Sequence, residues 1–249
     1  MRQRLPHLLD YLKDIAPDAI CLQEIKCLDE AFPREEIEAL GYNIATHGQK
    51  TFNGVAILSK HPMEIERGLP GDENDVQSRY IEAVIPWGKR VLRLGCVYLP
   101  NGNPVGTDKY PYKLGFMDRL IRHARDLMAF EEPLVIAGDY NVIPEARDAA
   151  HPEAWVEDAL FLPQTRAKYQ EMLALGFTEA LRATTDEGGV YTFWDYQAGA
   201  WQRNNGIRID HLLLSPQAAD RLVSVTVDKS MRGREKASDH VPVRIALKA

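Results

Sequence analysis

Leu134-Val135-Ile136-Ala137-Gly138-Asp139-Tyr140-Asn141 is an apolar run that follows Pro133 and ends in polar residues. A run this short, between a proline and a polar end, indicates a buried strand with a carboxylate at its carboxyl end. Apolar residues spaced every three or four positions over residues 114–128 predict a helix just before it. Helices that alternate with buried strands are typical of layered α/β folds. We therefore expect a buried sheet covered by helices.

The same alternation extends in both directions along the chain. Helical spacing predicts further helices over residues 5–15, 34–40 and 165–175. Short apolar runs predict strands over residues 19–23, 54–58, 80–85, 91–99, 190–194, 208–214, 222–227 and 241–247. The polar, proline-containing segment 144–162 is predicted to be a long excursion, a type of loop that often carries function. We find no linker, repeat or low-complexity tract, so we expect one domain over residues 1–249.

Composition limits the classes of protein to consider. No apolar stretch approaches the about 20 residues that a bilayer-spanning helix needs, so we expect no membrane partner. Charged residues interrupt the leucines of segment 1–14, which differs from the apolar core of a signal peptide and favours a cytoplasmic location. Cys21, Cys27 and Cys96 lack the spacing of zinc or redox motifs and are predicted to be buried free thiols.

The net charge of −6 gives no overall electrostatic reason to bind nucleic acid, which usually attracts basic surfaces. Binding to DNA is still compatible with this charge if the acidic residues gather at a metal site or on the far face. The basic run Arg232, Arg234 and Lys236 would then lie near the substrate.

Polar side chains that can carry chemistry stand where predicted strands or loops end. They are Glu24, Asp139 with Asn141, Asp210, and Asp239 with His240. Any one carboxylate at a strand end is more commonly solvated or caps the next helix. Together they are the types that metal-assisted phosphodiester hydrolysis needs: oxygen ligands for Mg²⁺, a group that activates water, and donors for the phosphoryl oxygens.

Seven blocks in order carry a resemblance to a known family. The blocks are Leu22-Gln23-Glu24-Ile25-Lys26, Asn53-Gly54-Val55-Ala56-Ile57-Leu58-Ser59, Tyr98-Leu99-Pro100-Asn101-Gly102, Gly138-Asp139-Tyr140-Asn141-Val142, Tyr191-Thr192-Phe193-Trp194, Arg208-Ile209-Asp210-His211 and Ser238-Asp239-His240-Val241-Pro242. Over almost the whole chain, this order resembles the exonuclease III group of DNA repair nucleases, within the endonuclease/exonuclease/phosphatase superfamily. The Gln-Glu-x-Lys form, the insertion at 155–166 and the Thr-Phe-Trp block point to that group specifically.

The resemblance implies a fold, an activity and a partner. The fold would be a four-layer α/β sandwich with two packed, mixed sheets flanked by helices. The activity would be Mg²⁺-dependent, with Mn²⁺ as a substitute: an abasic-site endonuclease and 3′-to-5′ exodeoxyribonuclease. The partner would be double-stranded DNA with abasic sites or 3′ ends, bound by a monomer.

The resemblance also assigns roles at the reaction centre. Glu24 would be the principal metal ligand and Asp239 a second one. Asp139 would align or deprotonate the attacking water, while Asn141 donates to the phosphoryl oxygen. His240 would hold the same phosphate.

Asp210 would orient His240, because a carboxylate beside a histidine keeps its donor proton aimed. Tyr98 would contribute its phenol to the scissile phosphate, with packing in the core as the alternative interpretation.

Lys26 and Asn101 fall on family positions beside the metal and the phosphate. Three apolar residues would line the pocket for a sugar without its base: Phe193, Ile207 and Ile209. An apolar pocket too small for a base selects the lesion. Ile207 stands where some relatives have tryptophan, and core packing is the alternative for all three.

Asn53, Arg79 and Arg208 are weaker candidates for the site. For the arginines, pairing with a carboxylate at a buried strand edge is the alternative.

The sequence departs from the family at its first strand. Relatives have one more strand ahead of Arg2 that runs into a Trp-Asn-x-Asn block, so we expect the domain to lack its first strand here. Two other functions stay open. One is a superfamily phosphodiesterase that acts on lipid head groups, inositol phosphates or RNA tails. The other is a catalytically impaired, truncated form that only binds DNA.

Overall fold

The structure, a computed structural model, describes residues 2–248, and its largest sheet has the strand order β4-β5-β6-β7-β9-β8. These strands are β4 (Glu64–Arg67), β5 (Tyr80–Trp87), β6 (Arg90–Tyr98), β7 (Leu134–Asp139), β8 (Thr178–Glu179) and β9 (Asp210–Leu214). β6 and β7 run parallel, and the helix α3 (Lys109–Met128) connects them, as a parallel crossover requires. The other neighbouring pairs are antiparallel.

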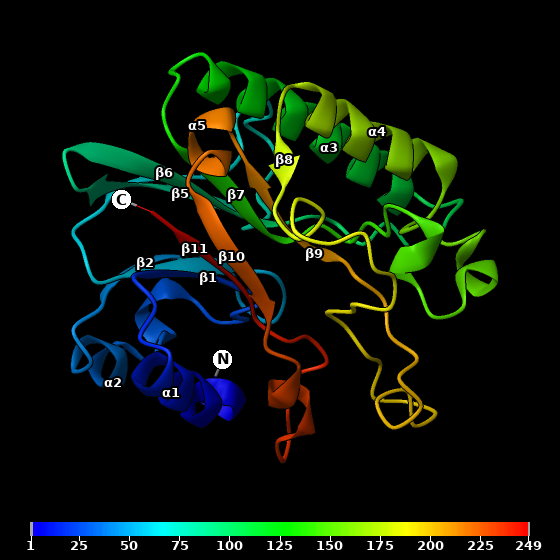
Figure 1. Cartoon of the computed structure of the whole chain (residues 1–249), viewed down its shortest axis with the longest axis horizontal. Helices are drawn as coiled ribbons and strands as arrows, with labels where there is room; N and C mark the ends of the chain where they lie inside the picture. Colours follow the sequence, from blue (N-terminus) through cyan, green and yellow to red (C-terminus); the bar gives the residue numbers. More distant parts are fainter. Residues whose placement is uncertain (1, 249) are drawn as a thin grey trace.

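Helices cover one face of this sheet. α3 and α4 (Pro163–Ala174) lie side by side over it (Figure 1). Phe116 and Leu120 of α3 pack there with Met172 of α4 and with Ile136 of β7. The apolar stripe expected over residues 114–128 is therefore the stripe that α3 buries against the sheet.

Two smaller antiparallel ladders cover the other face. One has the order β1-β3-β2, from β1 (Ala19–Gln23), β2 (Asn43–His47) and β3 (Val55–Ser59). The second pairs β10 (Leu222–Val227) with β11 (Val243–Leu247). Ile57 of β3 and Val243 of β11 belong to one apolar cluster with Cys96 of the large sheet. Both ladders thus pack on the same face.

α1 (Leu5–Asp14) and α2 (Arg34–Glu38) form the outer layer on that side (Figure 1). Leu12 and Ile37 from these helices pack against Leu58 of β3. The remaining helical pieces are η1 (Arg2–Arg4), η2 (Asp29–Ala31), η3 (Ala146–Asp148), η4 (Pro152–Trp155), α5 (Pro216–Ala219) and η5 (Lys229–Gly233). The order helix, sheet, strands, helix confirms the expected four-layer α/β sandwich.

The second strand layer differs from the expectation of two mixed sheets. Within residues 2–248, β1 pairs with β3 and β11 with β10, and no described strand bridges β1 to β11. β1 and β11 therefore each have one edge that pairs with no described strand. The expectation that the domain lacks its first strand remains a prediction, and these two edges are where one more strand could pair.

One strand prediction is wrong and three strands were missed. Residues 190–194 make only isolated bridges, from Phe193 to Ile207 and to His240. β2, β4 and β8 are short and partly exposed, so they lack a sustained apolar run. None of the three cysteines is in a disulfide, but only Cys96 is fully buried. None of the described helices is both long and apolar enough to cross a membrane.

Candidate active site

Three predicted site residues stand side by side on adjacent strands. The register pairs Tyr98 at the end of β6 with Asp139 at the end of β7. It also pairs Asp139 with Asp210 at the start of β9. Residues that are distant in sequence thus meet at one edge of the large sheet because strand pairing aligns them.

Gly138 explains how β6 and β7 approach so closely beside Asp139. Its φ is +150°, and a Cβ at this position would lie 1.9 Å from the carbonyl oxygen of Val97. Real Cβ atoms do not approach a carbonyl oxygen this closely, so glycine is required for this spacing.

Asp139 and Asn141 form a buried polar pair, each about 5% exposed. The Asn141 backbone N–H donates to Asp139 Oδ1 at 2.8 Å, and its Nδ2 donates to Asp139 Oδ2 at 3.2 Å. Asn101 Nδ2 donates to Asn141 Oδ1 at 3.1 Å. The structure therefore joins these three predicted residues in one hydrogen-bonded group.

His240 lies between two aspartates. Its Nδ1 is 2.9 Å from Asp210 Oδ2, and its Nε2 is 3.9 Å from Asp139 Oδ2. Burial disfavours the charged ring, but the charges of Asp210, Asp139 and Asp239 outweigh it and raise the pKa of His240 to about 10. A pKa this far above 7 favours the imidazolium form of the ring at neutral pH. Phe193 packs edge-on against it, with ring centroids 5.0 Å apart.

Glu24 lies on a strained turn after β1, with φ of +53°. Backbone hydrogen bonds hold this turn, from Ile25 N to Gly54 O and from Lys26 N to Asn53 O. The Glu24 carboxylate accepts from Tyr98 Oη and contacts Lys26 Nζ at 2.5 Å. Loss of water raises the pKa of Glu24, but these two partners outweigh that effect and lower it. The Tyr98 hydroxyl therefore faces the site and not the core.

Burial raises the pKa of Asp139 to about 7, and the negative charges of Asp210 and Glu24 add to the shift. His240 opposes it, as does the hydrogen bond from Asn141. A carboxylate with so many negative neighbours favours binding of a cation nearby.

The predicted metal ligands lie around this same histidine. The Asp239 carboxylate accepts from Tyr196 Oη and from Ser238 Oγ at 3.3 Å each, and both Glu24 and Asp239 act electrostatically on His240. Within residues 2–248, no three Asp, Glu, His or Cys side chains are gathered around one point, and Mg²⁺ usually takes only one or two carboxylates and keeps several waters. The donors themselves, carboxylate oxygens without thiols, fit a hard divalent cation.

The predicted sugar pocket is largely closed. Ile207 and Ile209 are each 3% exposed and share an apolar cluster with Leu160. Phe193 is half-buried at the edge of that cluster. Ile207 also lines a hollow with Trp155. The three residues lie together as expected, but Ile209 is part of the core.

The weaker candidates have structural partners. Arg208 is 1% exposed and pairs with Asp148 at 2.8 Å and Glu179 at 3.1 Å, as the alternative interpretation predicted. Asn53 Nδ2 donates to Gln49 at 2.9 Å. The Arg79 guanidinium lies 4.8 Å from the centre of the Tyr98 ring.

Sequence patterns gave no sign of two other residues near the site. Thr192 accepts the backbone N–H groups of Ile209 and Asp210, and Lys113 donates to the backbone of Asn141. Thr192 lies within the block Tyr191-Thr192-Phe193-Trp194, but only tertiary contacts reveal that its hydroxyl accepts these hydrogen bonds. Lys113 belongs to the polar part of a helical pattern, where lysine is normally exposed.

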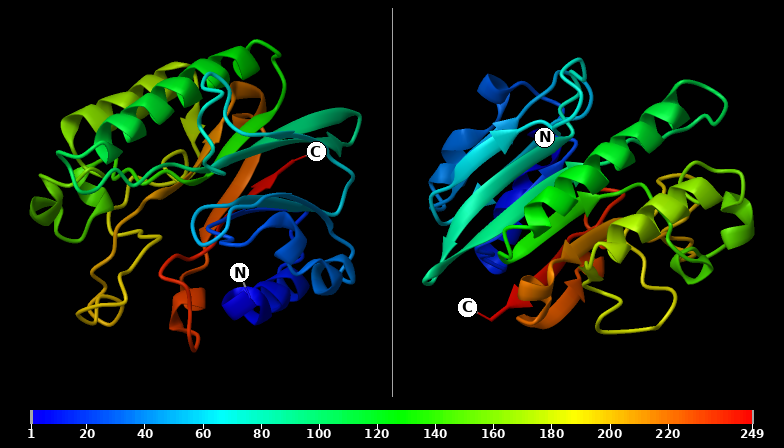
Figure 2. Two further views of the ribbon diagram at one scale, coloured as in Figure 1. Left: turned by 180° about the vertical axis from the view of Figure 1, so that it is seen from behind. Right: turned by 90° about the horizontal axis from the view of Figure 1, so that it is seen from above.

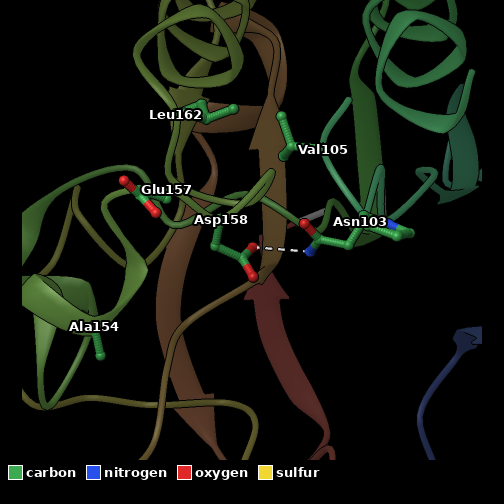
Figure 3. A pocket seen from close by; sticks show the side chains of 7 residues that line it. Asn103, Val105, Ala154, Glu157, Asp158 and Leu162 are labelled. Atoms are coloured by element: carbon green, nitrogen blue, oxygen red, sulfur yellow. Dashed lines mark hydrogen bonds between the residues drawn. The ribbon is translucent and has the colours of Figure 1, made fainter. Parts of the chain in front are cut away.

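The long excursion at 144–162 is tied to the loop after β6. Asn103 Nδ2 donates to Asp158 Oδ1 at 3.0 Å (Figure 3). Around this bond lies an open hollow, lined by Asn103, Pro104, Val105, Ala154, Glu157, Asp158 and Leu162. None of the predicted site residues lines it.

The loops that follow Trp194 and Asp228 project in the same direction, away from α3 and α4 (Figures 1 and 2). Arg232 joins them: it donates to the carbonyl oxygen of Trp194 at 3.1 Å and lies 5.1 Å from the ring centre of Tyr196. Tyr196 in turn contacts Asp239. Of the basic run 232–236, Arg232 thus lies close to a predicted metal ligand.

Comparison with known proteins agrees with this arrangement. The sequence profile described as the Endonuclease/Exonuclease/phosphatase family matches residues 2–240. The chain belongs to the Endonuclease/Exonuclease/phosphatase family.

Named relatives cover nearly the whole chain. Exodeoxyribonuclease III of Haemophilus influenzae is 36% identical over 96% of this chain and 93% of its own length. The DNA repair nuclease APEX1 of Danio rerio is 30% identical over 96% of this chain and 76% of its own.

Two solved structures share the fold closely. The 3′-5′ exonuclease NExo from Neisseria meningitidis has a TM-score of 0.95 and 37% identity, covering 99% of this chain and 95% of that one. An AP endonuclease from Archaeoglobus fulgidus has a TM-score of 0.94 and 34% identity, covering 100% and 95%.

Proposed function

We propose that this protein is a DNA repair nuclease of the exonuclease III type, which hydrolyses phosphodiester bonds of duplex DNA at abasic sites and at 3′ ends. One observation carries the proposal: strand register aligns Tyr98, Asp139 and Asp210. His240 lies between the two aspartates, and the Tyr98 hydroxyl donates to Glu24. Binding alone has no need of this combination of a buried carboxylate, an amide and an imidazolium.

The residues of the chain divide the work by their chemistry. Asp139 accepts the proton of the attacking water or aligns it, and a pKa of about 7 suits a general base near neutral pH. Asn141 and Asn101 present amide N–H groups to the phosphoryl oxygens as negative charge develops there. Tyr98 offers its hydroxyl to the same phosphate.

His240 supplies a positive charge to the phosphate, and Asp210 aims its ring through Nδ1. Lys26 holds the Glu24 carboxylate from the solvent side. A divalent ion, Mg²⁺ or its substitute Mn²⁺, held by Glu24 and Asp239, would offset the charge of the phosphate and its leaving oxygen.

The substrate class follows from the relatives. Their names include exodeoxyribonuclease III, AP endonuclease and 3′-5′ exonuclease, and one solved relative is described as a 3′ phosphatase bound to a product DNA hairpin. Abasic duplexes and recessed 3′ ends are therefore the proposed substrates, bound by a monomer. We also propose a cytoplasmic location, where such DNA is accessible.

A Mg²⁺-dependent incision assay on a duplex with one abasic analogue tests the proposal. We expect Asp139→Asn to lower the rate by roughly 100-fold or more, because it removes the general base. Asp126→Asn, at an exposed position of α3, is the matched control and should keep the wild-type rate.

An inositol phosphate tested in parallel separates the two main alternatives. Faster hydrolysis of the inositol phosphate would favour another superfamily phosphodiesterase. Binding to abasic DNA with no incision, or incision that survives Asp139→Asn, would instead contradict the proposed chemistry.

A further inference from the structure

Lys113 is a buried lysine in the middle of α3. Its side chain is 0% exposed, and its Nζ donates to the carbonyl oxygen of Asn141 at 2.6 Å and of Asn101 at 3.0 Å. Placing an ammonium group away from water is unfavourable, and two hydrogen bonds to neutral carbonyl groups offset only part of that cost. Stability alone therefore gives no reason for lysine here.

The two carbonyl groups that Lys113 binds belong to both asparagines of the site. Asn101 and Asn141 are 40 residues apart in sequence, yet their side chains are joined by a hydrogen bond of 3.1 Å. Asn141 adopts a left-handed conformation, with φ of +48°. The Lys113 amino group thus fixes the backbones of two loops, and the side-chain amide of Asn141 links them to Asp139.

The loop around Gly102 closely fits the lysine stem. A Cβ on Gly102 would lie 2.7 Å from Lys113 Cδ, and the glycine φ of +90° is in the left-handed region. The loop that carries Asn101 therefore wraps around this side chain without space to spare.

The charge of Lys113 acts on the site as well. Burial lowers the pKa of Lys113 to about 7, while Asp139 and Asp158 oppose the shift. The ammonium is thus within electrostatic range of the proposed general base.

We propose that Lys113 is a positioning residue, which holds the backbones of Asn101 and Asn141 so that their amides meet the phosphoryl oxygens. This inference rests on the proposed function. It predicts that the lysine serves turnover and not folding.

Lys113→Met tests this directly, because it keeps the length of the side chain and removes the donors. We expect a melting temperature close to that of the wild type, because removing a buried amino group offsets the loss of its hydrogen bonds to the two carbonyl oxygens. We expect kcat to fall by about 10- to 100-fold with KM within about threefold, because misplaced amides act on the transition state. Arg125→Met, at an exposed position of the same helix, is the control and should change neither.

Lys113→Arg is the conservative variant and should restore part of kcat, because guanidinium N–H groups can reach the same carbonyls. The proposal would be overturned by wild-type kcat in Lys113→Met. A parallel loss of kcat and melting temperature would also overturn it, because that pattern indicates a folding role.

A measurement independent of activity separates this inference from the proposed function. Side-chain amide signals of Asn101 and Asn141 in ¹⁵N NMR spectra should shift in Lys113→Met and remain in Arg125→Met. If the wild type proves inactive on DNA, the proposed function fails, but these spectra still decide the role of Lys113: unchanged signals overturn it.

Discussion

Asp210 favours the charged form of His240, the histidine that we propose holds the phosphate. It is one of three carboxylates that raise the pKa of His240 to about 10, and it makes the shortest contact. Asp210→Asn should lower the pKa of His240. The alkaline limb of the pH–rate profile, where His240 loses its proton, should therefore move to lower pH. The incision rate at neutral pH should fall by about 100-fold, a loss typical of removing a residue that assists proton transfer.

A pH–rate profile of incision in Mg²⁺ measures both effects. Asp220→Asn changes an exposed aspartate after α5 and should reproduce the wild-type profile. An unchanged alkaline limb in Asp210→Asn would contradict the role given to this carboxylate.

His211 is a buried histidine with a different task. Its Nδ1 lies 2.9 Å from Arg208 Nη1 and its Nε2 lies 2.9 Å from the carbonyl oxygen of Val142. Because arginine only donates, Nδ1 accepts and Nε2 carries the proton. Burial, with Arg208, lowers the pKa of His211 to about 3.

This shift predicts a stability that depends on pH. Between pH 6.5 and about 3 the unfolded chain binds a proton at His211 that the folded chain does not. The histidine therefore weakens the fold as pH falls through this window, by up to about 1.4 kcal/mol per pH unit. Urea unfolding of the wild type and of His211→Gln from pH 7 to pH 4 should show a shallower slope for the variant. Parallel slopes would refute this account.

At the scale of elements, Thr192 connects segment 190–194 to the start of β9. Its hydroxyl is completely buried and accepts the N–H groups of Ile209 at 3.1 Å and Asp210 at 3.2 Å. Thr192→Val keeps the shape but leaves two buried donors unpaired, at a cost of about 1 to 3 kcal/mol for each. Thr192→Ser keeps the hydroxyl and is the control.

Thermal unfolding should therefore show a lower melting temperature for Thr192→Val, by several degrees for a chain of this size. Incision should slow as well, because Asp210 loses its backbone anchor. Equal stability of the valine and serine variants would be inconsistent with this role.

The strand patterns were informative where a strand is buried on both faces. β3 and β7 are continuous apolar runs because each lies between two layers, so their positions could be predicted. Segment 190–194 carries a similar pattern but divides its backbone hydrogen bonds between Ile207 on one side and Asp239 and Val241 on the other. The sequence of these five residues alone cannot predict that their backbone hydrogen bonds go to two different segments.

The same contrast holds for the site. Glu24, Asp139 and His240 stood out because polar residues at strand ends match the needs of phosphate chemistry and a family pattern. Lys113 and the acceptor role of Thr192 could not be found in this way, because each depends on a contact with a distant segment of the chain. Such contacts exist only after the layers have packed.

At the scale of the whole molecule, the negative charge is concentrated where a cation is expected. The chain has a net charge of −6, and four carboxylates surround His240. Mg²⁺ should therefore stabilise the folded state, by about 2.7 kcal/mol when its concentration is 100 times its dissociation constant. Thermal unfolding with and without Mg²⁺ measures this.

Glu24→Gln should reduce the stabilisation, because it removes the carboxylate that we propose as the principal ligand. NaCl at equal ionic strength should not reproduce the effect of Mg²⁺. A shift in melting temperature that is the same in Glu24→Gln would place the ion elsewhere.

The close approach of β6 and β7 at Gly138 has a genetic consequence. A side chain at this position would collide with the carbonyl oxygen of Val97, 1.9 Å from its first carbon. In a library with every codon randomised and selected for repair of abasic lesions, position 138 should accept glycine alone. Position 138 would then be intolerant to mutation because of the spacing between two backbones, although glycine contributes no functional group.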